Sequence, residues 1–388
     1  MSQASSAPIG DAAWRARQRA RRIREWALQG ALALGLIALA IGFARNIGAN
    51  LDARQIKSGF DFLRDPAGFN IGELLFDYTS SDSYLRAFAV GMSNTLRVAL
   101  AGIALASVLG VVVGLMRLSR HPLLAWLGGA YVEVFRNTPL VIQLLAIYLL
   151  VTELLPEAAS AISIDGIALL SKEGLQIAVP QAGVLALACA LGALVIGGAA
   201  AWLVARRWLE VGAGLIGVVA GALLALIAWL LVGMASGWSQ PALDGFLISG
   251  GASLTPEFLA LWLGLSLFTS ASIAELVRAG VLAVPIGQWH AALALGLRRS
   301  QAMGGVISPQ ALRLTVPPLA SQYMNLIKNS SLAVLIGYPD LVSIANTSIN
   351  QNGQALEVIV IIMAVYLSLN LVVAIMSAIN ARVTRAPR

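Results

Sequence analysis

Charged residues are the scarcest class in this sequence of 388 residues. They make up 12% of it and hydrophobic residues 58%, whereas soluble domains carry about 25% charged residues. This composition excludes a disordered chain and nearly every water-soluble enzyme, because so few polar side chains do not cover a soluble protein. It predicts a helical membrane protein that crosses the bilayer several times.

Cysteine, histidine and lysine are also rare, and each shortage removes a kind of site. The one cysteine, Cys189, cannot form an internal disulfide or a CxxC metal site. The two histidines, His121 and His290, are too few for a histidine metal centre. No lysine follows a glycine, so the sequence has no Walker-type ATP loop. We therefore expect no enzyme activity, cofactor or metal in this chain, and any ATPase must be a separate polypeptide.

Apolar runs long enough to cross a bilayer, which takes about 20 helical residues, recur along the chain. They predict eight helices, at 26–44, 98–116, 137–152, 174–205, 211–243, 258–274, 314–339 and 358–381. The first run could belong to a signal peptide, but its length and the missing cleavage site favour an anchor helix. The third helix begins near either Pro122 or Pro139. The spacings Gly110–Gly114 and Gly217–Gly221 allow close contacts between helices, although some such pairs are expected by chance among 37 glycines.

Basic residues alternate with these runs in a way that sets the topology. With the N-terminus in the cytoplasm, eight crossings place every basic cluster on the cytoplasmic side, at 15–24, 117–120, 206–207, 298–313 and 382–388. Both termini are then cytoplasmic. The longest outer loop, 46–85, has no evident motif and is interpreted as a solvated spacer.

The cytoplasmic stretch 287–313 has a distinctive pattern. Residues 289–297 are strong helix formers with a small alanine face, Gly296 ends the helix, and a second short segment runs to Pro309. Small side chains suit close docking into a groove on a partner protein. A helix lying on the lipid head groups fits these residues equally well.

This stretch resembles the EAA loop of permease subunits in binding-protein-dependent ABC importers. Four of its positions, Ala291, Ala292, Gly296 and Pro309, fall in register, whereas His290 stands where that family has glutamate. Segments similar to polar-amino-acid permeases also occur, in the expected order, at 93–96, 133–140, 274–280, 317–318 and 326–337. The resemblance covers about 90–156 and 257–382.

The resemblance implies an all-α membrane protein with eight transmembrane helices, a type I ABC importer permease core with three extra helices. The chain then divides into a basic segment 1–25, an anchor helix 26–45, a periplasmic loop 46–85, core parts 86–157 and 257–382, an inserted hairpin with loops 158–256, and a tail 383–388.

The implied function is the translocation of L-amino acids, polar or acidic ones and their amides, across a bacterial inner membrane. The implied partners are two copies of an ATPase that binds ATP and Mg, a second related permease forming a heterodimer, a periplasmic amino-acid-binding protein and membrane lipid, but no nucleic acid. A secondary transporter driven by an ion gradient is the alternative, although the two halves show no convincing repeat.

Three groups of site residues follow. The resemblance assigns coupling to the ATPase to His290, Ala291, Ala292, Gly296, Leu297, Arg298 and Pro309. Candidates for the substrate pathway are Lys328, Asn329, Ser330, Ser331, Arg136, Asn137, Thr138 and Ser272. An intramembrane charge is a functional candidate, so Lys328 either attracts a substrate carboxylate or pairs with an acid of the partner, and the resemblance also implies a structural role for it. A helix cap explains Arg136–Thr138 more simply. Glu275 and Arg278, three residues apart, predict an ion pair or a gate.

Overall fold

The computed structural model describes all residues except 1–9, 54–58, 209–210, 245–246 and 385–388. Its helices are α1 (Gly10–Ala53), α2 (Tyr84–Arg117), α3 (Pro122–Asn137), α4 (Leu140–Leu149), α5 (Gly183–Trp208), α6 (Val211–Ser236), α7 (Pro256–Leu282), α8 (Ile286–Ala294), α9 (Arg299–Ala302), α10 (Ser308–Asn329), α11 (Leu341–Asn352) and α12 (Ala355–Thr384). Its strands are β1 (Ile162–Ile164), β2 (Ala168–Ser171), β3 (Gly174–Ile177), β4 (Val179–Pro180), β5 (Trp238–Ser239), β6 (Ala242–Asp244), β7 (Leu247–Ser249) and β8 (Ala252–Leu254).

The centre of the bundle is the contact between α2 and α7, where glycines replace bulkier side chains. A Cβ atom at Gly110 would lie 2.6 Å from Cβ of Ile273, and one at Gly114 would lie 2.9 Å from Cβ of Val277. The close contact predicted from the Gly110–Gly114 spacing is therefore confirmed. Around it, Leu144, Leu265 and Leu326 form a fully buried core with residues of α4, α7 and α10.

Five helices among the described residues are long and apolar enough to span a membrane, or seven if each of two bent pairs counts as one span. The fold is thus a mostly helical membrane bundle. The number eight stays a prediction. The first bent pair, α3 with α4, turns by 102° at Thr138–Pro139, because proline disfavours helical geometry in the residue before it. A helix therefore begins at Pro122 and another directly after Pro139.

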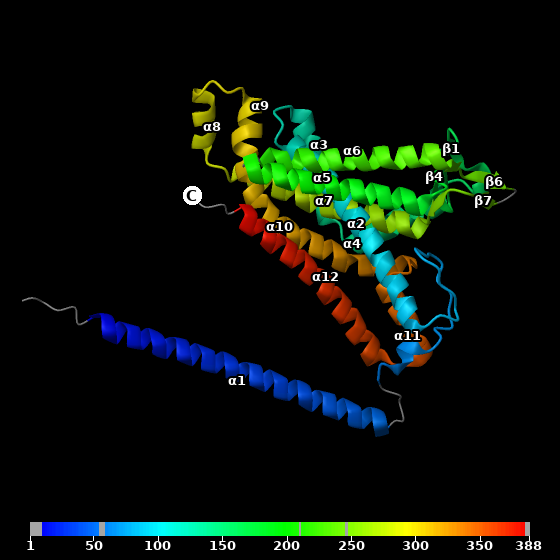
Figure 1. Cartoon of the computed structure of the whole chain (residues 1–388), viewed down its shortest axis with the longest axis horizontal. Coiled ribbons are helices and arrows are strands. Elements are labelled where there is room, and N and C mark those ends of the chain that lie inside the picture. Colours follow the sequence, from blue (N-terminus) through cyan, green and yellow to red (C-terminus); the bar gives the residue numbers. More distant parts are fainter. Residues whose placement is uncertain (1–9, 54–58, 209–210, 245–246, 385–388) are drawn as a thin grey trace, which may run out of the picture.

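The inserted region differs from the expectation, since its apolar run from 174 begins as strands and α5 starts only at Gly183. Antiparallel pairing gives a four-stranded sheet in the order β1-β2-β3-β8 and two small hairpins, β4-β5 and β6-β7. The two long helices α5 and α6 pack against each other as the expected hairpin (Figure 1). These strands correct the purely helical class inferred from the sequence.

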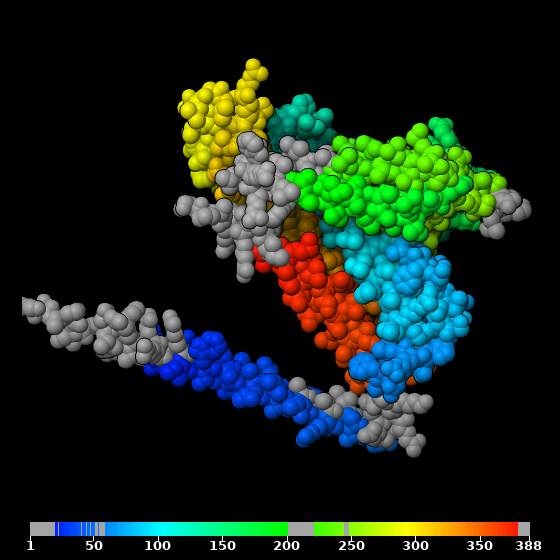
Figure 2. Space-filling model, viewed as in Figure 1, coloured from blue at the N-terminus to red at the C-terminus, as the bar shows by residue number. Residues whose placement is uncertain are grey.

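The outer loop is also different from the predicted solvated spacer. Phe62, Ala67, Ile71 and Tyr78 are buried against the outer part of α2 and against α11 and α12. The segment is therefore a packed part of the bundle. By contrast, α1 stands apart from the bundle (Figures 1 and 2), and its apolar stretch Ile23–Asn50 is 0% buried.

Candidate functional site

The stretch 287–313 projects from one end of the bundle as two short helices, α8 and α9 (Figure 1). Helix α8 begins after Pro285 and ends at Ala294, and the chain then reverses at Gly296, which has a φ of 78°. This left-handed conformation is costly for residues with a Cβ atom, which explains the glycine. Pro309 lies in the first turn of α10, where a proline has no hydrogen bond to lose.

A small apolar cluster fixes this projection to the bundle. Val281 of α7 and Val284 just beyond it pack with Ile307, directly before α10, and with Ala311 of α10, and Trp289 of α8 packs against them. Two polar contacts add to it. The side chain of Gln310 donates to Gln288 Oε1 at 3.1 Å, and the guanidinium of Arg299 lies 5.2 Å above the Trp289 ring. These contacts attach α8 to the ends of α7 and α10.

The remaining face of α8 is open. His290 and Ala291 are exposed, whereas Ala292 is 2% exposed and faces the cluster. Leu293 and Leu295 are 46% and 82% exposed, and the stretch 287–313 contains no acidic residue. The other predicted coupling residues follow at the turn, where Gly296 and Arg298 are exposed and Leu297 and Pro309 are half-buried. The open face is apolar and basic.

An ion cluster lies just inside this end and joins α2 to α7. Glu275 accepts a hydrogen bond from Arg278 Nη2 at 3.0 Å, as the spacing predicted. It also forms an ion pair with Arg117, the last residue of α2. Sequence reasoning assigned Arg117 only to a cytoplasmic charge cluster, because no local spacing relates it to a residue 158 positions later.

The residues at the α3–α4 bend cap the helix end. The Thr138 hydroxyl donates to the Val134 carbonyl at 2.8 Å, and Asn137 donates to Glu133 at 3.3 Å. Gln143, which the sequence did not single out, closes the bend by donating to the Phe135 and Thr138 carbonyls, both at 2.8 Å. These contacts are those of the simpler explanation, a cap, and Arg136 beside them is exposed.

The second group of pathway candidates ends α10. Lys328 is exposed, and the hydroxyls of Ser330 and Ser331 donate to the carbonyls of Ile327 and Lys328, both at 2.7 Å. Asn329 and Ser272 are half-buried. Among the described residues, no hydrogen bond or ion pair joins this group to the one at the α3–α4 bend. The segments that carry the two groups nevertheless pack together, since Leu140 and Leu144 of α4 share one buried cluster with Leu326 and Ala333.

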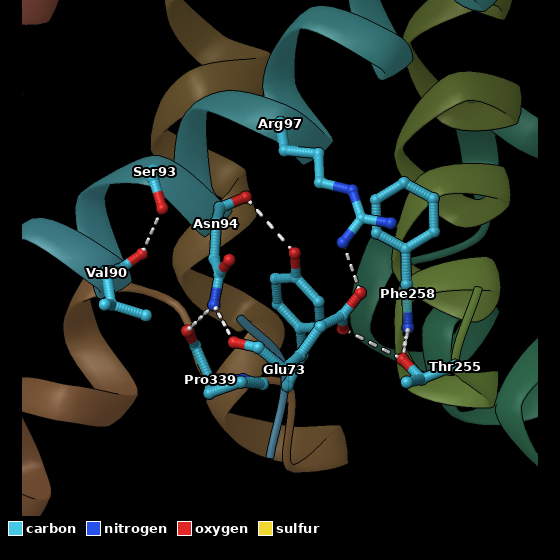
Figure 3. Close-up of polar contacts among 9 residues, drawn as sticks. Glu73, Val90, Ser93, Asn94, Arg97, Thr255, Phe258 and Pro339 are labelled. Carbon is cyan, nitrogen blue, oxygen red and sulfur yellow. Dashed lines mark hydrogen bonds and ion pairs between the residues drawn. The ribbon is translucent and has the colours of Figure 1, made fainter. Parts of the chain in front are cut away.

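A polar cluster missed by the sequence reasoning lies at the opposite end of the bundle (Figure 3). Glu73, from the outer loop, is 8% exposed, and its Oε1 lies 2.5 Å from Nη1 of Arg97 on α2. Its Oε2 accepts a hydrogen bond from the Thr255 hydroxyl, before α7, at 3.0 Å. The Arg97 guanidinium also covers the Phe258 ring at 4.5 Å, so it is not free to reach toward the membrane surface.

Backbone carbonyls of this cluster are hydrogen-bonded as well. Asn94 on α2 donates to the carbonyls of Glu73 and Pro339, each at 3.0 Å. Burial raises the pKa of Glu73 above its ordinary value, although the charge of Arg97 acts in the opposite direction. A cavity of about 380 Å³ adjoins the cluster and is lined by Asn70, Glu73, Glu257, Ser343 and Thr347, among others. The described residues contain no group of acids, histidines and cysteines suited to a metal ion.

Comparisons with known proteins agree on the kind of molecule. A family model described as binding-protein-dependent transport system inner membrane component matches residues 106–385. The amino-acid ABC transporter permease YhdX of Escherichia coli is 42% identical over 94% of this chain and 95% of its own length. The general L-amino acid transport system permease AapQ of Rhizobium johnstonii is 39% identical over 91% of each chain.

A third relative has a narrower name. The glutamate/glutamine/aspartate/asparagine transport system permease BztB of Rhodobacter capsulatus is 33% identical over 91% of this chain and 92% of its own length. Among solved structures, an amino acid ABC transporter crystallised with histidines is 22% identical, covers 77% of this chain and 94% of its own, and has a TM-score of 0.47.

Proposed function

This chain belongs to the family of inner-membrane components of binding-protein-dependent transport systems, and from that membership we propose that it is the translocation subunit of an ATP-driven importer of L-amino acids. The names of its relatives favour polar and acidic amino acids and their amides as substrates. A periplasmic binding protein delivers the substrate. The ATPase is a separate subunit in two copies that binds ATP and Mg, and this chain has no enzyme activity of its own.

The projection formed by α8 is the observation that supports ATP coupling. Its inner face is anchored to α7 and α10, and its open face presents the apolar and basic residues between His290 and Arg298. This is the arrangement expected of an element that docks into a groove of the ATPase and transmits its closure to the helices. A partner shifts a protein between two conformations only if it binds one of them more tightly than the other. Here the ATPase would do so through its contact with α8.

The topology proposed for the membrane has both termini in the cytoplasm and eight spans. In its support, α8, α9, the last turn of α5, the first turn of α6 and the end of α12 all lie at one end of the bundle (Figure 1). Arg206 and Arg207 of α5, Arg298 and Arg299 at the start of α9, and Arg382 of α12 belong to these parts of the chain, as the distribution of Lys and Arg in membrane proteins requires. The outer loop and the strands lie at the other end.

The substrate pathway is proposed to run between this chain and a second, related permease. Lys328 and Arg136 are exposed in the single chain, which suits side chains that face a pathway completed by a partner. With Asn329, Ser272 and the neighbouring hydroxyls they offer cationic and hydrogen-bonding groups to a substrate carboxylate. Replacing Lys328 with methionine tests this role. We expect the variant to lose more of its transport of acidic amino acids than of its transport of neutral ones.

Reconstitution in proteoliposomes tests the proposed function. The chain is combined with its partner permease, ATPase and binding protein, and ATP hydrolysis is measured with single L-amino acids. Hydrolysis stimulated by the liganded binding protein is expected, and deletion of 289–297 should abolish the stimulation. Replacement of His290 by glutamate, the residue of related loops, should leave coupling intact or improve it. Uptake driven by an ion gradient without the ATPase would contradict the proposal.

A further inference from the structure

The inserted strands form a compact unit, the strand cap, made of β1 to β8. It is built from two chain segments, one before α5 and one after α6, which pair through β3 with β8 and β4 with β5. Figure 1 shows it at the end of α5, α6 and α7 that is opposite to α8. With α8 on the cytoplasmic side, as in the proposed function, the strand cap lies outside the membrane, where the substrate arrives.

Three glycines show that the strand cap is tightly constructed. Gly174, Gly250 and Gly251 have positive φ angles, and a Cβ atom on each would lie 2.1, 2.4 and 2.6 Å from a backbone oxygen. No other residue type fits such close approaches of backbone. The strand cap is therefore a specific scaffold and not a pair of loose connections between helices.

The outward edge of this scaffold is unusually apolar. Strand β1 pairs only with β2 in its sheet, so its other edge is open. Ile162 and Ile164 lie on one face of β1 because side chains alternate along a strand, and they are 51% and 55% exposed. Ile167, in the turn that follows, is 61% exposed. Exposed apolar groups on an open edge are typical of a surface that another molecule covers.

The charges of the chain segment that carries these isoleucines, together with the residues just before β1, indicate what covers them. Four acidic residues between 153 and 173 are exposed, Glu153, Glu157, Asp165 and Glu173. The one base in that stretch, Lys172, is half-buried. Anionic lipid head groups are repelled by such a surface, whereas a protein with a basic face is attracted to it. The complementary partner is thus a basic protein surface and not the membrane.

We propose that the strand cap is the docking surface for the substrate-binding protein, which places a basic rim on the carboxylates and an apolar patch on the isoleucines. The inference rests on the proposed function, since it requires a binding protein at the outer end of the bundle. The carboxylates accelerate the encounter, and the isoleucines lengthen the life of the complex. Docking then brings the released amino acid to the outer end of α7, which follows β8 directly.

The test measures how much liganded binding protein half-maximally stimulates ATP hydrolysis in the proteoliposomes described above. The variant Glu157→Lys with Asp165→Lys reverses the charge of the edge, and Ile162→Ser with Ile164→Ser removes its apolar patch. Asp77→Lys is the matched control, because Asp77 is an exposed acid of the outer loop that lies outside the strand cap. ATP hydrolysis without binding protein is recorded for each variant as a check of assembly.

We expect both double variants to need at least about tenfold more binding protein, a loss of about 1.4 kcal/mol of docking energy, with unchanged basal hydrolysis. Added salt should weaken docking of the wild type more than docking of the charge-reversed variant. Half-maximal stimulation at the wild-type concentration in both variants would overturn the inference. An equal loss in Asp77→Lys, or loss of assembly with the second permease, would also overturn it. A wild-type complex that no binding protein stimulates would instead contradict the proposed function itself.

Discussion

Each end of the bundle has an arginine of α2 paired with a glutamate, which belongs to α7 at the inner end and to the outer loop at the outer end, and the two pairs differ in burial and in charge balance. At the inner end, Glu275 is 27% exposed and is shared by two arginines. At the outer end, Glu73 is 8% exposed and has one arginine, Arg97, as its ion-pair partner. The inner pair links two long helices directly, whereas the outer pair also ties a loop to them.

This difference has an energetic consequence. The arginines are similarly accessible, Arg117 at 19% and Arg97 at 23%, so the difference lies in the glutamates. A glutamate that keeps access to water and a second arginine loses little when one arginine is removed. A buried pair is costly to break, since the remaining charge is left without compensation. The inner end is therefore suited to rearrangement during a transport cycle, and the outer cluster to holding the outer loop in one place.

The largest effect is expected when the outer pair is broken. Replacing Arg97 with methionine leaves the Glu73 carboxylate buried without its counter-charge, which should lower the free energy of unfolding by about 3–5 kcal/mol. Thermal unfolding of the chain in detergent measures it. The double variant Arg97→Met with Glu73→Gln removes both charges and should recover most of the loss. A single variant as stable as the wild type would mean that the outer end is no more rigid than the inner end.

A second prediction concerns the packing of α2 against α7, between the two ends of the bundle. Replacing Gly110 with alanine forces a Cβ atom against Ile273 and should destabilise the bundle by about 1–3 kcal/mol, as overpacking does. Gly129 in α3 is the control, because nothing lies within 4 Å of its Cβ position. Alanine there should be neutral or stabilising by up to about 1 kcal/mol. Equal effects at both positions would show that α2 and α7 can separate without loss.

Breaking the inner pair in the same way should change the free energy of unfolding only slightly. Replacing Arg117 with methionine leaves Glu275 with Arg278 and with partial access to water, so we expect a loss of at most about 1 kcal/mol. The same unfolding assay gives the comparison with Arg97→Met. If Arg117→Met lowered the free energy of unfolding as much as Arg97→Met does, burial of the glutamate would not make the two ends differ in stability.

Local patterns predicted much of this structure, and the errors have a common cause. The helices α2, α7 and α12, the bend before Pro139, the reversal at Gly296 and the Glu275–Arg278 pair all depend on residues close in sequence. The Glu73–Arg97 and Glu275–Arg117 pairs join distant segments that no spacing rule connects. The apolar run from 174 predicts a helix, but absence of charge is common to buried strands and helices, and the residues between Gly174 and Pro180 form short strands.

Protonation of Glu73 tests the comparison between the two ends with the smallest structural change, because it leaves every heavy atom in place. Burial raises the pKa of Glu73 above the ordinary value of 4.5, so the folded chain binds this proton more tightly than the unfolded chain does. The stabilising contribution is present at low pH and is lost as the pH rises from about 4.5 through the raised pKa. The part of the unfolding temperature that depends on Glu73 should therefore fall as the pH rises across that range. In Glu73→Gln this part of the fall should be absent. An identical pH profile in the variant would show that the outer carboxylate is as well solvated as the inner one.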